Sequence, residues 1–282
     1  MGDKVLIAGC GDVGNALANR LLAGGCEVWG VRRRVNLLAS GVTPWRIDLQ
    51  NANTFGSPPA AFDYLFYTAS ADRRDEEHYR SIYVHALRDL LSALRTAGCP
   101  LRRVFFTSST AVYGQSRGQW VDERSTTAPS GFNGRVLLEA ESVVRDGAES
   151  GITVRLSGIY GPGRTRLVRK VWDGQAKANG SWTNRIHVED CAGALHHLMR
   201  LRDPSNLYLG SDDEPAITAD VVRWLSAELD VAEPPVEQVL RLNKRCRNDR
   251  LCDSGYRFQY PTFRDGYRDI VRDFLAEQRA TR

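Results

Sequence analysis

Three glycines near the start of the chain have the types and spacing that bind a phosphate. Gly9, Gly11 and Gly14 form the pattern G-x-G-x-x-G, which follows an apolar run and opens a helical pattern. Such glycines permit a tight turn, a close approach of the backbone to a pyrophosphate, and close packing of helix on strand. The anion then meets N–H groups at the positive end of the helix. We expect this turn to bind a dinucleotide through Gly9, Gly11, Asp12, Val13 and Gly14; a purely structural turn is the alternative.

The end of the second predicted strand indicates which dinucleotide would bind. This segment reads Val31-Arg32-Arg33-Arg34 and contains no acid. An NAD-specific site has Asp or Glu there, which accepts hydrogen bonds from the ribose 2′-hydroxyl. A guanidinium instead grips a 2′-phosphate through paired hydrogen bonds. We therefore expect NADP as the cofactor, held mainly by Arg32 and Arg33, and leave NAD open; a solvated arginine loop is the alternative.

Short apolar runs alternate with helical patterns through the first 160 residues. Strands separated by helices predict βαβ units and a mostly parallel sheet covered on both faces. The fold class is therefore a doubly wound parallel α/β sheet of the Rossmann type. The predicted strands lie at residues 5–8, 27–31, 44–49, 64–67, 104–107 and 153–156, and the predicted helices at 13–21, 76–96 and 136–148.

The pattern loosens after Gly161, and we find no clear linker and no internal repeat. Helices are expected near residues 167–178, 188–200 and 218–229, and short strands near 185–187 and 207–210. We expect a dinucleotide-binding Rossmann domain at residues 1–160. A smaller α/β substrate lobe, closely packed on it and able to return strands to the sheet, would occupy residues 161–282.

Composition excludes several classes of protein. The chain has 282 residues, is 42% hydrophobic and 26% charged, and carries a net charge of +4, which is ordinary for a folded soluble protein and gives no sign of nucleic-acid binding. No apolar run has the length of a bilayer span, and the first apolar run is too short for a secretory signal. The six cysteines form no C-x-x-C pair, so we expect reduced thiols and a cytoplasmic location. No P-loop and no H-E-x-x-H pattern occur, so we expect no metal.

Further segments extend the pattern beyond the glycine-rich turn. They are I-D-L at residues 47–49, F-T-S-S-T-A-V-Y-G at 106–114, V-D-E at 121–123, R-L-S-G-I-Y-G-P-G at 155–163 and I-H-V-E-D at 186–190. In this order and spacing, over residues 4–267, the chain resembles the extended short-chain dehydrogenase/reductase superfamily, the group of NAD(P)-dependent epimerases and dehydratases. Residues 260–266, Y-P-T-F-R-D-G, resemble an atypical bacterial branch of that superfamily.

The resemblance assigns roles to individual positions. Ser109 matches the catalytic hydroxyl that holds the substrate oxygen, although Ser108 and Ser109 could also be polar strand-end residues bonded to the backbone. Asp48 and Leu49 would flank the adenine, and Ser157 and Gly158 would lie near the nicotinamide. The full set of further cofactor contacts that it implies is Asp48, Leu49, Thr68, Ala69, Ser70, Thr107, Ser108, Ser157 and Gly158.

The chain departs from the superfamily where proton transfer takes place. The usual shuttle is a Tyr followed four residues later by a Lys, which lowers the Tyr pKa. The helix after Ser109 has no Tyr, and no Lys occurs between Lys4 and Lys170. Arg135 would take the Lys position, leaving Gly131 where the Tyr is expected, and an arginine cannot lose its proton. The sequence leaves Tyr113, Tyr160 and His187 open as substitutes.

A basic run at residues 241–250 contains Arg241, Lys244, Arg245, Arg247 and Arg250. It is interpreted as a solvated helix face or as an anion clamp for a phosphorylated or nucleotide-linked substrate. No aromatic residues alternate with these bases, so nucleic acid is a poor candidate.

Two functions fit the whole pattern. The first is an NADP-preferring oxidoreductase of the epimerase/dehydratase type, acting on a small, sugar-like or nucleotide-sugar substrate through Ser109, Arg135 and Tyr160. The second is an NADP(H)-binding sensor or regulatory protein that has kept the pocket and lost the chemistry. A small-molecule substrate, no membrane partner and a homodimer are the expected partnerships.

Overall fold

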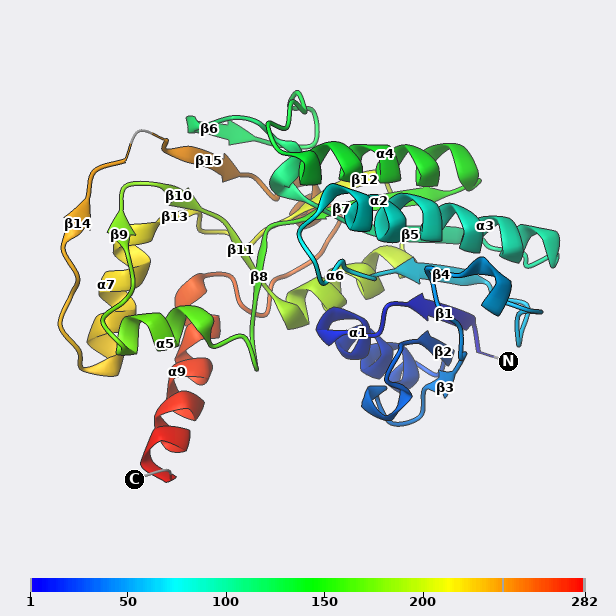
Figure 1. Ribbon diagram of the computed structural model, residues 1–282, viewed down its shortest axis with the longest axis horizontal. Coiled ribbons are helices and arrows are strands. Elements are labelled where there is room, and N and C mark those ends of the chain that lie inside the picture. The colour runs from blue at the N-terminus through cyan, green and yellow to red at the C-terminus, as the bar shows by residue number, and fades with distance from the viewer. Residues whose placement is uncertain (1, 240, 281–282) are drawn as a thin grey trace. The chain divides into compact units, whose positions relative to one another are not determined.

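The structure is a computed structural model and describes residues 2–239 and 241–280 (Figure 1). Contacts divide the chain into two compact units, each discontinuous in sequence. One junction falls between Leu156 and Ser157, near the boundary expected at residue 160, and the observed division has more segments than expected. The first unit comprises Met1–Gly114, Thr127–Leu156 and Cys191–Tyr208, and the second comprises Gln115–Thr126, Ser157–Asp190 and Leu209–Arg282.

A seven-stranded sheet has the order β12-β7-β5-β4-β1-β2-β3. Every pairing from β3 to β7 is parallel. Strand β4 is buried along its whole length, because a parallel sheet covered on both faces leaves no side for water. The doubly wound parallel α/β fold predicted from the sequence is confirmed. The strands are β1 (Lys4–Ala8), β2 (Glu27–Val31), β3 (Thr43–Pro44), β4 (Tyr64–Tyr67), β5 (Arg103–Ser109), β7 (Gly151–Leu156) and β12 (Leu207–Gly210).

Helices cover this sheet (Figure 1), and the residues that they bury are mostly apolar. The helix predicted at residues 76–96 is observed, and its second half buries Leu87, Leu90, Leu91 and Leu94 at the three- and four-residue spacing of a helix. Figure 1 shows this helix beside α4, above the sheet, with α1 and α6 below. The bounds are α1 (Asp12–Ala23), α2 (Glu76–Arg80), α3 (Ala86–Thr96), α4 (Phe132–Gly147) and α6 (Val188–Arg200), with short 3-10 turns η1 (Val35–Leu37), η2 (Ala52–Thr54) and η4 (Thr110–Val112).

A π-helical turn, η3 (Ser81–His85), interrupts the helix between α2 and α3. The N–H group of Ala86 donates to the carbonyl of Ser81, five residues back. The hydroxyl of Tyr67 on β4 donates to the carbonyl of Ile82 at 2.5 Å, so a side chain from the sheet enters the helical ladder. Such an intrusion is a recognised cause of a local change in helix pitch.

One strand is shorter than expected, and one helix was not predicted. The strand expected at 44–49 pairs only over Thr43–Pro44, because the chain then turns, with the Ile47 N–H bonded to the Trp45 carbonyl. The sequence pattern predicted no helix at the end of the chain. The structure has an 18-residue helix there, α9 (Phe263–Ala280), which buries Phe263, Ile270 and Phe274 among other residues.

The second unit has its own apolar core, formed mainly by α5, α7 and α9. Its strands are short and occur in four separate pairs: β15 with β6, β11 with β8, β14 with β9, and β10 with β13. The bounds are β6 (Arg117–Val121), β8 (Gly158–Tyr160), α5 (Arg166–Trp172), β9 (Ala178–Asn179), β10 (Trp182–Thr183), β11 (Arg185–His187), β13 (Ala216–Ile217), α7 (Thr218–Leu229), β14 (Val236–Glu237), β15 (Asn243–Cys246) and α8 (Asp249–Asp253).

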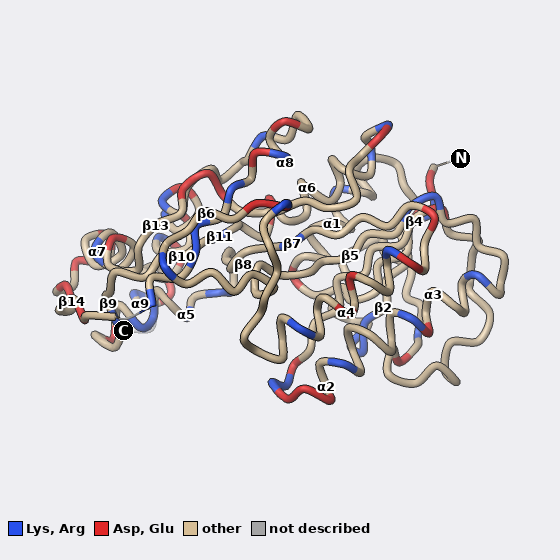
Figure 2. The backbone as a smooth tube through the Cα atoms, turned by 90° about the horizontal axis from the view of Figure 1, so that it is seen from above, with Lys and Arg blue, Asp and Glu red and all other residues tan. Residues whose placement is uncertain are grey.

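Charged residues of both signs are interspersed along the backbone (Figure 2), as the net charge of +4 suggests. Among residues 2–239 and 241–280, no helix has the combination of length and hydropathy that a bilayer span needs. Within the same residues, no three His, Cys, Asp or Glu side chains are placed to hold a metal ion.

Candidate functional site

The glycine-rich turn between β1 and α1 has the shape that a pyrophosphate requires. Gly9 has a φ of +105°, and a Cβ there would lie 2.2 Å from the Ala69 nitrogen. A Cβ on Gly14 would lie 2.6 Å from the Gly9 oxygen. A Cβ on Gly11 would meet nothing within 4 Å, and no side chain caps the helix that starts after it. The fold thus requires glycine at positions 9 and 14, whereas Gly11 faces open space where a ligand can approach.

A cavity of about 580 Å³ opens beside this turn, within the range of small-molecule sites. It gathers segments that follow β1, β2 and β4, because the carboxyl ends of parallel strands share one edge of the sheet. Asp12, Val13, Gly14, Thr107 and Ser108 are not among its lining residues. The expected cofactor residues that do line it are Gly9, Gly11, Arg32, Arg33, Asp48, Leu49, Thr68, Ala69 and Ser70.

Two residues at the cavity hold its own walls together. The hydroxyl of Thr68 donates to the carbonyl of Gly9 at 2.8 Å and so ties the end of β4 to the glycine-rich turn. The carboxylate of Asp48 accepts from the backbone N–H of Gln50 at 3.0 Å. Both side chains therefore fix the backbone around the cavity.

The two arginines expected to hold a 2′-phosphate have different surroundings. Nη1 of Arg32 donates to the carbonyls of Cys10 and Leu37 at 2.8 and 2.7 Å, so part of this guanidinium braces the turn. The Arg33 side chain is 75% exposed, and its Nη2 lies 2.7 Å from Oδ2 of Asp72. The Arg33 guanidinium holds the pKa of the Asp72 carboxyl below its usual value. Arg33 is therefore the more available of the two for a ligand.

Sequence motifs did not reveal Asp72 and His78, which also line the cavity. Asp72 lies on the loop after β4, and His78 lies in α2 with 5% of its surface exposed. Neither belongs to a spacing pattern that indicates a site. Only the path of the loop from β4 back toward the end of β2 brings them to Arg33.

The hydroxyl groups at the end of β5 are engaged in local bonds. Ser109 accepts a hydrogen bond from the Ala111 N–H at 3.1 Å and caps the short turn η4. The Ser108 hydroxyl donates to Glu141 at 2.6 Å, in the interior. Thr107 donates to the carbonyl of Tyr67 at 3.2 Å. Ser109 thus keeps its own hydroxyl proton for another acceptor, whereas Ser108 belongs to the buried network.

That buried network anchors α4 to the sheet. Arg155 on β7 donates to both carboxylate oxygens of Glu141 on α4, at 3.0 and 2.7 Å. Its Nη1 also donates to the hydroxyl of Tyr113 at 2.9 Å. Tyr113 is buried and serves as an acceptor here, which places this candidate proton donor in a structural role.

The start of α4 carries none of the superfamily's proton-transfer groups. Gly131 is the N-cap residue, and Phe132 is the first helical residue. The Phe132 ring meets the Tyr79 ring edge-on, with centroids 5.4 Å apart. Arg135 is 53% exposed, donates to the Ser130 carbonyl at 3.3 Å and lies 3.8 Å from a Glu76 oxygen. Tyr79, which no motif pointed out, is thus the phenol that the structure places beside this helix start.

Tyr160 and His187 lie in the core of the second unit. Tyr160 is 3% exposed, stacks on Tyr267 with centroids 4.8 Å apart, and donates to the Thr262 carbonyl at 3.2 Å. Burial raises the pKa of its phenol, which opposes its ionisation. His187 is 2% exposed, and burial lowers its pKa.

Ser157 and Gly158 also belong to the second unit, at the start of β8. Their backbone N–H groups donate to the carbonyls of Gly210 and Asn184 at 2.9 and 3.0 Å. Both residues therefore fix the path of the backbone at this strand.

The basic run at residues 241–250 is not a helix face, because Asn243–Cys246 forms strand β15 beside β6. Lys244 is 9% exposed, and burial lowers its pKa. The Arg245 guanidinium lies 4.6 and 4.9 Å from the ring centroids of Trp120 and Trp182. Trp120 on the paired strand β6 and Trp182 on β10 thus supply the aromatic neighbours that the linear sequence lacks.

The parallel sheet, the glycine-rich turn and the cavity at the strand ends define a Rossmann-type dinucleotide-binding protein. The profile of the NAD dependent epimerase/dehydratase family matches residues 5–208, and the chain belongs to this family. The resemblance stated from the sequence motifs is therefore confirmed.

Similar proteins are known from sequence and structure. Protein YeeZ of Escherichia coli K12 is 28% identical over 271 residues, which cover 92% of this chain and 96% of YeeZ. A structure from Methylobacillus flagellatus, assigned to the NAD-dependent epimerases/dehydratases, is 38% identical with a TM-score of 0.83, covering 99% of this chain and 100% of that one. The human epimerase family protein SDR39U1, solved with NADPH, shares the fold at 20% identity and a TM-score of 0.79, covering 95% and 99%.

Proposed function

We propose that this protein is an NADP(H)-dependent oxidoreductase of the epimerase/dehydratase type, acting on a small, sugar-like or nucleotide-sugar substrate. One observation carries the proposal. The glycine-rich turn and Arg33 face the same cavity of about 580 Å³, and β2 ends without a carboxylate. A guanidinium at that place favours a 2′-phosphate, which a β2 carboxylate would repel.

The residues present fit a dinucleotide. Gly11 leaves open space for the pyrophosphate, and the uncapped start of α1 offers an anion the positive end of a helix. Arg33 would hold the 2′-phosphate, while Arg32 keeps the neighbouring turn in place. Leu49 and Asp48, which also line the cavity, would flank the adenine.

The cofactor, when bound, supplies hydride transfer at its nicotinamide ring. Ser109 would donate its hydroxyl proton in a hydrogen bond to the reacting oxygen, because its Oγ accepts from the Ala111 N–H and leaves that proton available. Arg135 would hold a ribose hydroxyl or phosphate as a fixed cation, since a guanidinium does not release its proton. Proton transfer therefore runs without the Tyr-Lys pair.

Human SDR39U1, which binds NADPH in its solved structure, supports the proposal only as a protein of the same fold. Membership of the epimerase/dehydratase family supports the reaction class more directly.

A second function, a cofactor-binding sensor without turnover, is favoured by the start of α4. Neither Gly131 nor Phe132 carries a phenol at the position expected for the Tyr, and Arg135 does not give up its charge as an acid. The two functions share the cofactor site and differ in whether any substrate is converted.

Calorimetry on the full chain with NADPH and NADH tests the cofactor assignment. Arg33→Ala should lower NADPH affinity about 10- to 100-fold, the size of a lost charge-assisted hydrogen bond, and change NADH affinity less than about threefold. Arg74→Ala is the matched control, since Arg74 is exposed and does not line the cavity. Failure of the wild type to bind either coenzyme would overturn the proposal. NADPH oxidation against carbonyl and nucleotide-sugar panels then separates enzyme from sensor.

A further inference from the structure

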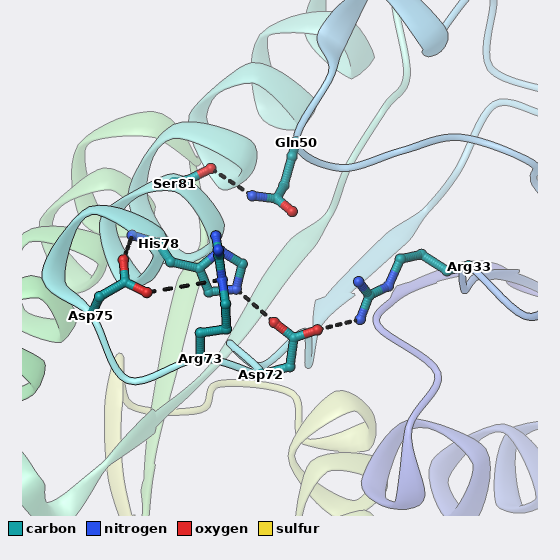
Figure 3. A network of polar contacts seen from close by, with 7 residues as sticks. All are labelled: Arg33, Gln50, Asp72, Arg73, Asp75, His78 and Ser81. Atoms are coloured by element: carbon teal, nitrogen blue, oxygen red, sulfur yellow. Dashed lines mark hydrogen bonds and ion pairs between the residues drawn. The ribbon is translucent and has the colours of Figure 1, made fainter.

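The cavity wall contains a carboxylate with no role in the proposed function. Asp72 follows Ser70 on the loop after β4, lines the cavity, and lies opposite Arg33 (Figure 3). Its Oδ2 is 2.7 Å from Nη2 of Arg33. Both side chains are largely exposed, at 75% for Arg33 and 51% for Asp72, so a ligand can reach them. A phosphate that binds Arg33 must therefore meet this carboxylate.

His78 fixes the other oxygen of the same carboxylate (Figure 3). Nε2 of His78 lies 2.8 Å from Oδ1 of Asp72, and Nδ1 lies 3.1 Å from Nη2 of Arg73. An arginine only donates hydrogen bonds, so Nδ1 is the acceptor and Nε2 carries the proton that faces Asp72. The Asp72 carboxylate thus has one oxygen on a buried imidazole and one on Arg33.

The imidazole is itself held by the start of α2. Asp75 caps this helix by accepting a hydrogen bond from the backbone N–H of His78 at 2.8 Å. The His78 side chain is 5% exposed, so it has little freedom to follow Asp72 away from the cavity. Asp72 consequently stays near Arg33 even when Arg33 binds something else.

We propose that Asp72 is a selectivity residue of the dinucleotide site, which opposes the 2′-phosphate of NADP(H) and favours the 2′-hydroxyl of NAD(H). This inference rests on the proposed function. A carboxylate and a phosphate compete for the same guanidinium, and the fixed charge of Asp72 repels the phosphate that displaces it. A ribose hydroxyl, by contrast, donates to a carboxylate. The loop after β4 thereby supplies the acid that the end of β2 lacks.

Asp72→Asn tests the inference by removing the charge and keeping the shape. The ratio of NADPH to NADH affinity in calorimetry should rise about fivefold to tenfold, the size of a like-charge interaction near a protein surface. The rise should shrink in 0.5 M salt, because both partners are exposed. Glu77→Gln is the matched control: it removes the same charge five residues away, from an exposed side chain outside the cavity lining.

The outcomes are distinct. If the wild type binds neither coenzyme, the proposed function fails and this inference falls with it. If NADPH binds and Arg33→Ala weakens it, but Asp72→Asn leaves the affinity ratio equal to that of Glu77→Gln, the proposed function stands and the inference is overturned. Thermal melting of each variant checks that a changed ratio does not come from a changed fold.

Discussion

The β1–α1 turn and the start of α4, both in the first unit, keep very different amounts of the family's chemistry. The turn retains each glycine that the pyrophosphate and the fold require, with an open approach at Gly11. The start of α4 offers Gly131 and Phe132 instead of a phenol, and Arg135 instead of an amine. The residues expected to bind the cofactor and those expected to transfer a proton thus lie in separate elements, so a chain can keep one set and lack the other.

Helix α4 is present although the Tyr-Lys pair is absent from it, and its buried face gives a physical reason. Glu141 joins α4 to β7 through Arg155 and to β5 through Ser108. The Glu141 side chain is 10% exposed and that of Arg155 is 7% exposed. A helix that satisfies a buried cation cannot be lost without unfolding its surroundings.

The largest expected effect is that of Glu141→Ala, which leaves Arg155 buried without its carboxylate. Breaking a buried pair on one side costs about 3–5 kcal/mol of unfolding free energy. Urea denaturation measures this loss, with Glu139→Ala as the control on the exposed side of the same helix. Equal stabilities of the two variants would show that α4 is not kept for this anchor.

The next effect separates binding from folding at the glycine-rich turn. Gly11→Ala places a methyl group in the open space where the pyrophosphate would lie, so NADPH affinity should fall about 100-fold while stability falls by less than about 1 kcal/mol. Gly9→Ala should lower both the NADPH affinity and the stability, because φ is +105° and the new Cβ would lie 2.2 Å from the Ala69 nitrogen. Calorimetry and thermal melting on both variants measure the difference. If Gly11→Ala binds NADPH as tightly as the wild type, the glycine-rich turn does not bind the pyrophosphate at Gly11.

The parts of the site that lie close together in sequence could be predicted. The glycine-rich turn is local, since strand, turn and helix follow one another within Lys4–Ala23. Gly9 and Gly14 themselves indicate where the turn has no room for a side chain. The same holds for the buried run Tyr64–Tyr67, whose apolar residues predict a central strand. The parallel sheet follows from the alternation of such local elements.

Contacts between distant segments could not be predicted. Asp72 meets Arg33 only because the loop after β4 returns to the end of β2, 39 residues earlier. The aromatic neighbours of Arg245 come from β6 and β10, far away in the sequence. The short pairing at β3 depends on a turn after Trp45 that apolar content alone does not indicate. Each of these depends on tertiary packing rather than on local pattern.

A smaller effect, on catalysis, is expected for Ser109→Ala. If Ser109 holds the reacting oxygen, turnover should fall about tenfold, as for one lost hydrogen bond in the transition state, while NADPH affinity stays within about twofold. Steady-state kinetics with a substrate found in the panel screen measures it. The variant also loses the hydrogen bond from the Ala111 N–H to Ser109, which stabilises the turn by about 1 kcal/mol, and thermal melting measures this loss separately. Unchanged turnover in the variant would remove Ser109 from the mechanism.

The smallest effect concerns His187, one of the residues considered as a substitute for the missing Tyr, which is 2% exposed. Burial holds its pKa below the ordinary 6.5, while Asp190, Glu189 and Asp269 raise it in part. Between that lowered value and 6.5, the unfolded chain binds a proton that the native protein does not, so this residue makes stability fall as the pH falls below 6.5. The variant His187→Asn keeps an acceptor for the Glu189 N–H. The difference in unfolding free energy between this variant and the wild type should change by less than about 1.4 kcal/mol per pH unit in that window. Denaturation midpoints of both proteins between pH 5 and pH 8 measure it, and two parallel pH profiles would show that His187 titrates as it does in water and remains a candidate for proton transfer.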